Sequence, residues 1–195
     1  MFDLSPYFKL ISSRGRLLAL MNFVFFASVF AVAIASELLL PPRLYSGWQA
    51  RFPEIIIGNN FLIVLLGIFL SNLVLSAFVV VTLPGFVFFP ISIAMLLFRG
   101  FLWGVFLAFQ PTWLLLAAIP TVVLEGEGYA LAAVAGTVVG VSWLKSKWIF
   151  NDENITRVEA FQKGLKECLV IYLLVGTILL VAAIIETVTL EMVIR

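Results

Sequence analysis

Long apolar stretches dominate this chain and restrict what it can fold into. A helix needs about 20 mostly apolar residues to cross a hydrocarbon core about 30 Å thick. Hydrophobic residues make up 63% of the 195 residues and charged residues only 12%, whereas soluble domains have about 25% charged residues. Because a soluble fold of this size cannot bury so much apolar surface, the sequence predicts a membrane protein with several spans.

Five stretches have the length of a transmembrane helix, and we expect them to form one all-α, polytopic bundle that occupies residues 1–195 as a single domain. The fourth stretch contains Pro120 and then two glutamates that alternate with glycines as far as Gly128. Since proline and glycine weaken helices, we predict that this span is broken near Pro120 to Gly128. The predicted spans are 17–36, 55–82, 85–109, 113–143 and 165–187.

Lysine and arginine gather in two places, which predicts the orientation of the bundle. One group precedes the first span, in a segment 1–16 with the character of an interfacial helix, and the other lies in the connection 144–164. Cationic connections are retained in the cytoplasm, and four crossings separate the two groups. We therefore expect a multi-pass protein of a cell membrane, with a cytoplasmic N-terminus, a cytoplasmic connection 144–164 and a C-terminus outside.

Three charged residues fall near the middle of predicted spans, where each charge costs roughly 2.5–3.5 kcal/mol. Arg99 lies 12 positions before Pro111, and Glu125 lies 14 positions after it, which corresponds to about 18 and 21 Å along ideal helices. The two side chains should therefore lie at a similar depth. We predict that Arg99 pairs with Glu125 or with Glu127, and the sequence does not decide between the two.

Three roles are open for this intramembrane cluster of Arg99, Glu125 and Glu127. It can be a structural ion pair, part of a pathway for an ion or small solute, or a pocket for a protein partner, and the sequence favours the structural pair. Two other intramembrane polar residues are expected to have simpler roles. Asn72 hydrogen-bonds another helix, and Glu186 reaches the membrane interface.

Small residues recur at four-residue spacing in three spans and predict close approach of helix backbones. The pairs are Gly67 with Ser71, Gly100 with Gly104, and Gly136 with Gly140. Such pairs predict packing rather than a particular oligomer, and a homo-oligomer is compatible with them.

Residues for catalysis or metal binding are scarce. The sequence contains no histidine, the most frequent metal ligand and general base, and its lone Cys168 cannot form an internal disulfide. The net charge of +1 offers no basic surface for nucleic acid. We therefore expect no enzymatic activity, no cofactor, no metal and no nucleic-acid partner, and we expect the lipid bilayer and other membrane or envelope proteins as partners.

Four stretches combine small, apolar and single polar residues: IGNN at 57–60, FRGFLWG at 98–104, IPTVVLE at 119–125 with the small residues that follow, and AAIIE at 182–186. Together they resemble the stage II sporulation protein M family of polytopic membrane proteins. The family pattern has a histidine and a glycine where this chain has Thr121 and Val122, so a role that depends on the histidine does not transfer. The resemblance singles out Asn60, Gly100, Gly104, Pro120, Glu125, Gly136 and Glu186.

The leading interpretation is a noncatalytic membrane scaffold or assembly factor. The resemblance implies it, because the family in sporulating bacteria is a membrane scaffold that works with two cell-wall-degrading partners. The alternative is a transporter or channel component that uses Arg99, Glu125 and Glu127 in a pathway for an ion or small solute. A sealed ion pair and an open, wet cavity around Arg99 and Glu125 point to different functions.

Overall fold

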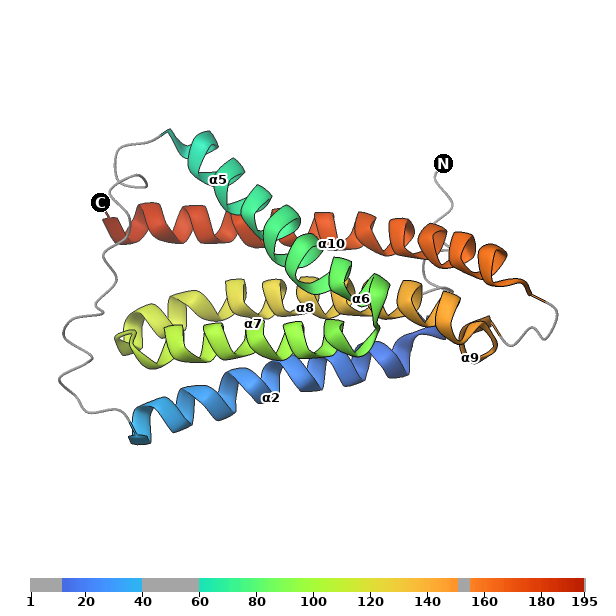
Figure 1. Ribbon diagram of the computed structural model, residues 1–195. Coiled ribbons are helices and arrows are strands. Elements are labelled where there is room, and N and C mark those ends of the chain that lie inside the picture. Colours follow the sequence, from blue (N-terminus) through green and yellow to red (C-terminus); the bar gives the residue numbers. More distant parts are fainter. Residues whose placement is uncertain (1–11, 40–59, 151–154, 195) are drawn as a thin grey trace.

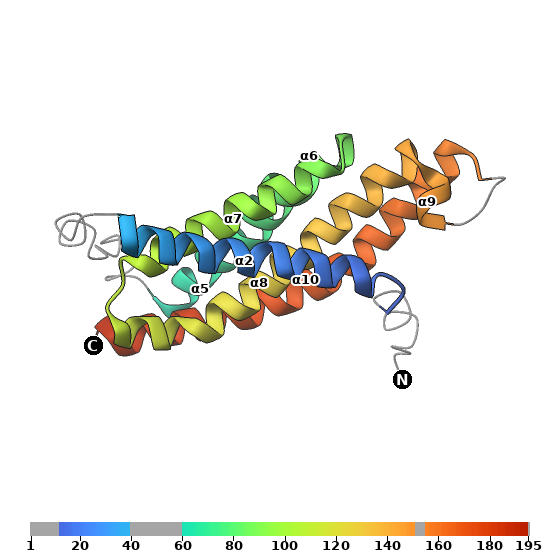
Figure 2. The same cartoon turned by 90° about the horizontal axis from the view of Figure 1, so that it is seen from below.

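The computed structural model describes residues 12–39, 60–150 and 155–194, and these form helices and no strands. Five spans are long and apolar enough to cross a membrane, which confirms the predicted all-α class. Four of them run along one long axis, and part of the second leaves it diagonally (Figures 1 and 2). The elements are α2 (Gly15–Leu39), α5 (Phe61–Leu70), η1 (Ser71–Thr82), α6 (Leu83–Val87), α7 (Pro90–Ala108), α8 (Thr112–Leu144), α9 (Ser146–Phe150) and α10 (Arg157–Ile194).

The second span consists of α5, η1 and α6, which follow one another without a break. η1 is a π-helix of 12 residues, in which each N–H bonds the carbonyl five residues earlier. Four η1 residues, Ser76, Ala77, Val81 and Thr82, are buried, whereas no residue of α5 is buried. The span is therefore packed into the bundle at its α6 end and diverges from it at its α5 end (Figure 1).

Two predicted boundaries are wrong. The third span was expected to start at Gly85, but Leu83–Val87 continues the second span and α7 begins at Pro90. Proline in the first turn of a helix gives up no helical hydrogen bond, so it starts α7 readily. The fifth span is also longer than predicted, since α10 begins at Arg157, where Thr156 and Glu159 cap each other's backbone N–H groups.

α8 does not contain the predicted break, because it is one continuous α-helix that includes Pro120. The proline removes a single backbone hydrogen bond. The glycines that follow serve close packing instead of unwinding. A Cβ atom on Gly126 would lie 2.6 Å from the ring of Phe25, and one on Gly128 would lie 2.7 Å from the side chain of Leu179.

α8 forms the centre of the bundle, and every residue from 128 to 142 is buried. Two of the predicted small-residue contacts are confirmed, one at α8 and one between α7 and α2. A Cβ atom on Gly136 would lie 2.7 Å from the carbonyl oxygen of Thr82, and one on Gly100 of α7 would lie 2.8 Å from that of Phe25 in α2. Around Gly67, in contrast, the described residues place no atom within 4 Å of a Cβ position.

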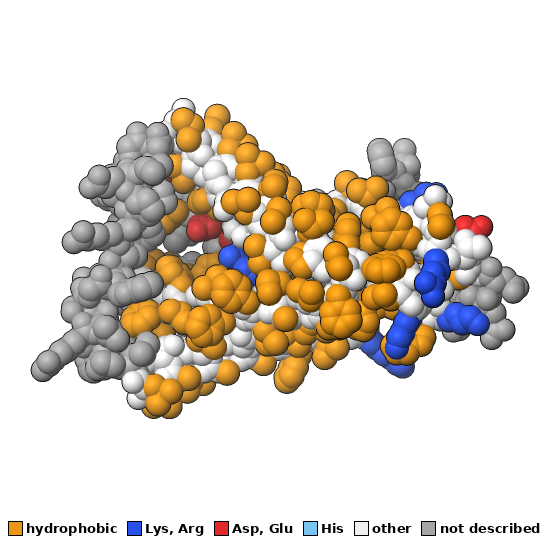
Figure 3. Space-filling model, in the orientation of Figure 1, with side chains coloured by type: hydrophobic (Ala, Val, Ile, Leu, Met, Phe, Trp, Pro, Cys, Tyr) orange, Lys and Arg blue, Asp and Glu red, His pale blue; other side chains and the backbone are white. Residues whose placement is uncertain are grey.

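Apart from Arg99, the basic residues among those described gather at the end of the bundle that holds α9 (Figure 3). Here Arg14 forms an ion pair with Glu167 at 3.0 Å, and the Lys145 ammonium lies 3.6 Å from the centre of the Trp148 ring. Cations and aromatic rings together are typical of a membrane interface. Both cationic segments thus lie at the same end of the bundle, as the predicted orientation requires. That this end faces the cytoplasm stays a prediction. Residues 1–11 of the segment 1–16 and 151–154 of the connection 144–164 lie outside the described residues.

Candidate functional site

A cavity of about 490 Å³ lies between the diverging α5 and the other spans. Figure 3 shows acidic and basic side chains in the depression between α5 and α7, and we call this space the lateral cavity. One wall is apolar and comes from α5 through Ile63, Val64 and Ile68. The other wall is polar and is formed by Asn72, Arg99, Trp103, Glu125 and Glu186. The volume is typical of pockets that hold small molecules or side chains.

The ionisable residues of the lateral cavity lie well inside the transmembrane region. Counting along each helix from its nearer end, Arg99 lies about 14 Å, Glu125 about 20 Å and Glu186 about 12 Å inside the bundle. Charges at such depth need a partner or water. The contacts of each group therefore decide what the cavity can do.

Tyr129 of α8 is the centre of a hydrogen-bond network in the polar wall. Nη2 of Arg99 donates to the Tyr129 hydroxyl at 2.7 Å, and the guanidinium carbon lies 4.6 Å from the centre of the ring. The hydroxyl lies 3.0 Å from Oε2 of Glu125 and 3.0 Å from Oδ1 of Asn72, and its one proton serves one of them at a time. The amide of Asn72 donates to Oε1 of Glu125. Both oxygens of Glu125, which is 2% exposed, therefore have partners.

The predicted direct ion pair is absent, since Arg99 reaches Glu125 through the Tyr129 hydroxyl. Glu127 is not part of this network. Its Oε2 accepts a hydrogen bond at 3.1 Å from the side chain of Asn22 in α2, because two residues along an α-helix rotate a side chain by about 200°. The two glutamates that were predicted to form one cluster with Arg99 thus lie on different faces of α8. The prediction for Asn72, a hydrogen bond to another helix, is confirmed.

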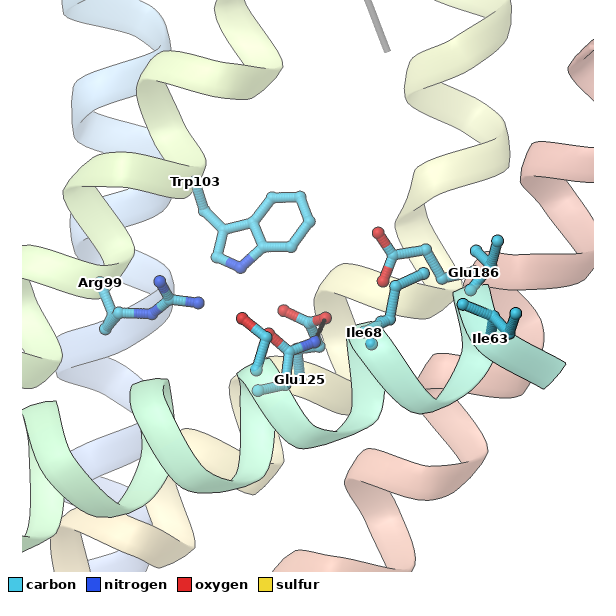
Figure 4. A pocket seen from close by; sticks show the side chains of 10 residues that line it. Ile63, Ile68, Arg99, Trp103, Glu125 and Glu186 are labelled. Atoms are coloured by element: carbon cyan, nitrogen blue, oxygen red, sulfur yellow. Dashed lines mark hydrogen bonds between the residues drawn. The ribbon is translucent and has the colours of Figure 1, made fainter. Parts of the chain in front are cut away.

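Glu186 does not reach the interface as predicted. It projects from α10 into the lateral cavity toward Glu125 (Figure 4), and the two carboxylates interact electrostatically. Its Oε2 atom is buried and has no hydrogen-bond partner, and the same holds for Nε of Arg99. The sequence prediction placed Glu186 at the interface because it lies near the end of the predicted span 165–187, although the AAIIE stretch had marked it as a position to examine.

The other positions singled out by the resemblance have structural roles. Asn60 caps α5, with its side-chain oxygen accepting the N–H of Leu62 at 3.1 Å. Gly100, Gly104 and Gly136 permit close helix contacts, whereas Pro120 lies on the exposed surface of α8. Among the residues that the structure describes, no cluster of three potential ligands could hold a metal ion. The lateral cavity is therefore the candidate site.

Together, the five spans and the lateral cavity define a polytopic helical membrane protein with a polar site in its transmembrane region. A family model described as stage II sporulation protein M matches residues 18–189. The chain belongs to this family, and the match extends over parts of all five spans, which confirms the resemblance. No curated protein and no solved structure matches the chain.

Proposed function

We propose that the protein is a noncatalytic membrane subunit that organises other membrane or envelope proteins by binding a transmembrane helix of a partner. The side of α5 at Gly67, together with Ser71 at the start of η1, carries this proposal, and we call it the free face. Helices associate in membranes where small residues let backbones approach closely. Gly67 and Ser71 provide such a site, yet no described residue fills the space next to Gly67.

Elsewhere in the bundle, the small-residue faces are each filled by a neighbouring helix. Gly100 and Gly104 hold α7 against α2, and Gly136 and Gly140 hold α8 against the second span. α5, in contrast, has no buried residue, and its Ile63 is 59% exposed although it lines the lateral cavity. Within the described residues, two of the small-residue faces are therefore used internally, and the third has no helix packed against Gly67. Family membership supports a membrane role for this surface.

Site-directed photo-crosslinking in the native host tests the proposal. A photoreactive phenylalanine analogue at Ile63 should form an adduct with a specific membrane protein. The same analogue at Phe23, which is 72% exposed on α2, is the matched control and should not form it. Gly67→Leu, which blocks the free face, should abolish the adduct.

Adducts with lipid alone, or equal adducts from Ile63 and Phe23, would contradict the proposal. An adduct that survives Gly67→Leu would show that the partner binds elsewhere. If the only adduct is with a second copy of the chain, the free face serves homo-oligomerisation and not the assembly of other proteins.

A transport role is the second candidate, and the lateral cavity with Arg99, Glu125 and Glu186 favours it. A pathway through Glu127 has no support, since that residue lies outside the cavity. Reconstitution in liposomes separates the candidates. An assembly subunit gives no ion or proton flux, whereas flux that is lost in Glu186→Gln but kept in Glu127→Gln would support transport.

A further inference from the structure

We infer that the partner helix carries a lysine or arginine whose charged group enters the lateral cavity and pairs with Glu186. This inference rests on the proposed function and specifies the chemistry of the partner. The inference follows from the excess of carboxyl groups over basic groups in the cavity, from the unpaired Oε2 atom of Glu186, and from the place where the cavity opens.

The polar groups of the lateral cavity are unequally satisfied. One basic side chain, that of Arg99, faces two carboxyl groups, those of Glu125 and Glu186. Arg99 is bound to the Tyr129 hydroxyl, and Glu125 is satisfied by Tyr129 and Asn72. Glu186 lies against the carboxyl group of Glu125, and its Oε2 is buried without a hydrogen bond. A cation at this place would pair with Oε2 and allow both carboxyl groups to be charged beside Arg99.

The opening of the cavity indicates where that charge comes from. Gly67 of α5 and Ser71 at the start of η1, which form the free face, line the same cavity as Glu186. A helix that packs on this face therefore lies across the opening. Lipid chains can cover the apolar wall of α5, but they cannot solvate a carboxylate. A partner helix can bring a cation to this depth as part of its own sequence.

The walls of the cavity suit a long basic side chain. The methylene groups of lysine or arginine can lie along Ile63 and Ile68 while the charged end points to Glu186, since these side chains stand around the same space (Figure 4). The indole of Trp103 also faces this space (Figure 4), and an indole ring attracts cations. A cavity of about 490 Å³ gives such a side chain room to enter.

Neutralisation of Glu186 tests the inference in the full-length protein. Glu186→Gln keeps the size of the side chain and removes its charge, so the yield of the Ile63 adduct should fall at least tenfold at equal protein level. Glu127→Gln is the matched control, because Glu127 is also an intramembrane carboxylate but binds Asn22 outside the cavity; its adduct yield should not change. Thermal unfolding of both purified variants in detergent should match the wild type.

The partner itself provides an independent test that needs no variant. Mass spectrometry of the Ile63 adduct identifies the crosslinked segment, which should contain a lysine or arginine within its transmembrane stretch. Exchanging the charges, with Glu186→Lys here and glutamate at the basic position of the partner, should restore an adduct that either change alone abolishes.

Two outcomes would overturn the inference while the proposed function stands. One is an adduct that persists in Glu186→Gln but is lost in Gly67→Leu, and the other is a crosslinked span without any basic residue. In both cases a helix docks on α5 without the charge. If the wild-type protein gives no specific adduct at Ile63, the proposed function itself fails.

Discussion

Two faces share one sequence spacing but have opposite surroundings. One is the α7 face at Gly100 and Gly104, and the other is the α5 face at Gly67, which continues to Ser71 at the start of η1. On α7, the glycines lie against the backbone of α2, whose Phe25 and Val29 carbonyl oxygens occupy the space of a Cβ atom. On α5, that space is empty within the described residues. A pair of small residues thus shows that another helix can approach closely. Whether that helix belongs to the same chain or to another molecule depends on what surrounds the pair.

Substitution at Gly104 should have the largest effect on stability. In Gly104→Leu the new Cβ would lie 2.6 Å from the Val29 carbonyl oxygen and 2.7 Å from the Val32 Cβ, and neither atom can move freely. We expect a loss of at least about 3 kcal/mol, seen as disappearance of the monodisperse peak in size-exclusion chromatography. Gly67→Leu should keep this peak, and its loss there would show that the α5 face is not free.

Removal of the Tyr129 hydroxyl should have the next largest effect, because this group joins the packed α8 to the second span. Tyr129→Phe leaves Arg99 and Glu125 without a shared partner, which should lower the free energy of unfolding by about 2–3 kcal/mol. Tyr172→Phe is the control, since its hydroxyl meets only the neutral Thr82 hydroxyl at 2.6 Å and should cost about 1 kcal/mol. Equal losses in thermal unfolding would contradict the central role of Tyr129.

A hydrogen bond within the α2 and α7 contact should contribute less than the glycine packing beside it. The Ser28 hydroxyl donates to the Leu97 carbonyl at 2.9 Å. Since interhelical hydrogen bonds in membranes average about 0.6 kcal/mol, Ser28→Ala should lower the melting temperature in detergent only slightly. A loss as large as that of Gly104→Leu would mean that polar contacts, rather than close packing, hold this face together.

The ion pair at the cationic end should have an effect about as small as that of Ser28→Ala, and it lies away from both small-residue faces. Arg14 and Glu167 are 18% and 15% exposed and lie 3.0 Å apart, so Arg14→Gln should cost about 0.5–1 kcal/mol after allowance for solvent screening. Raising the salt concentration should shrink the difference in melting temperature between this variant and the wild type. An adduct at Ile63 that depended on Arg14 would contradict the separation of the two ends.

The number of spans and the depth of the charged residues could be predicted, because both depend on residue counts along helices. Arg99 and Glu125 do lie in the same polar wall of the lateral cavity. The intervening Tyr129 could not be predicted, since a tyrosine in an apolar stretch fits lipid contact, aromatic packing and hydrogen bonding equally well. Counting along the helix also could not separate Glu125 from Glu127, as the direction of each side chain depends on how α8 is rotated in the bundle.

The errors at Pro120 and Glu186 have different physical causes. Local propensity predicted a broken helix, but Phe25 and Leu179 fill the space beside Gly126 and Gly128, and this tertiary packing favours a continuous helix. Glu186 was placed at the interface because it lies near the end of the predicted span 165–187. α10 extends beyond it as far as Ile194, so the same residue lies inside the bundle.

The π-helix η1 limits how the length of the second span can change. A π turn holds one residue more than an α turn, because its hydrogen bonds reach five residues back instead of four. Deleting one residue between Asn72 and Thr82, with the π turns otherwise kept, would rotate the two ends against each other by one residue step, which is somewhat less than the about 100° of an α-helix. Thr82 is anchored to the Ala132 carbonyl at 2.8 Å, so Asn72 would swing away from Glu125. The register of this span, and not only the identity of its residues, keeps the polar wall in phase with the packed core.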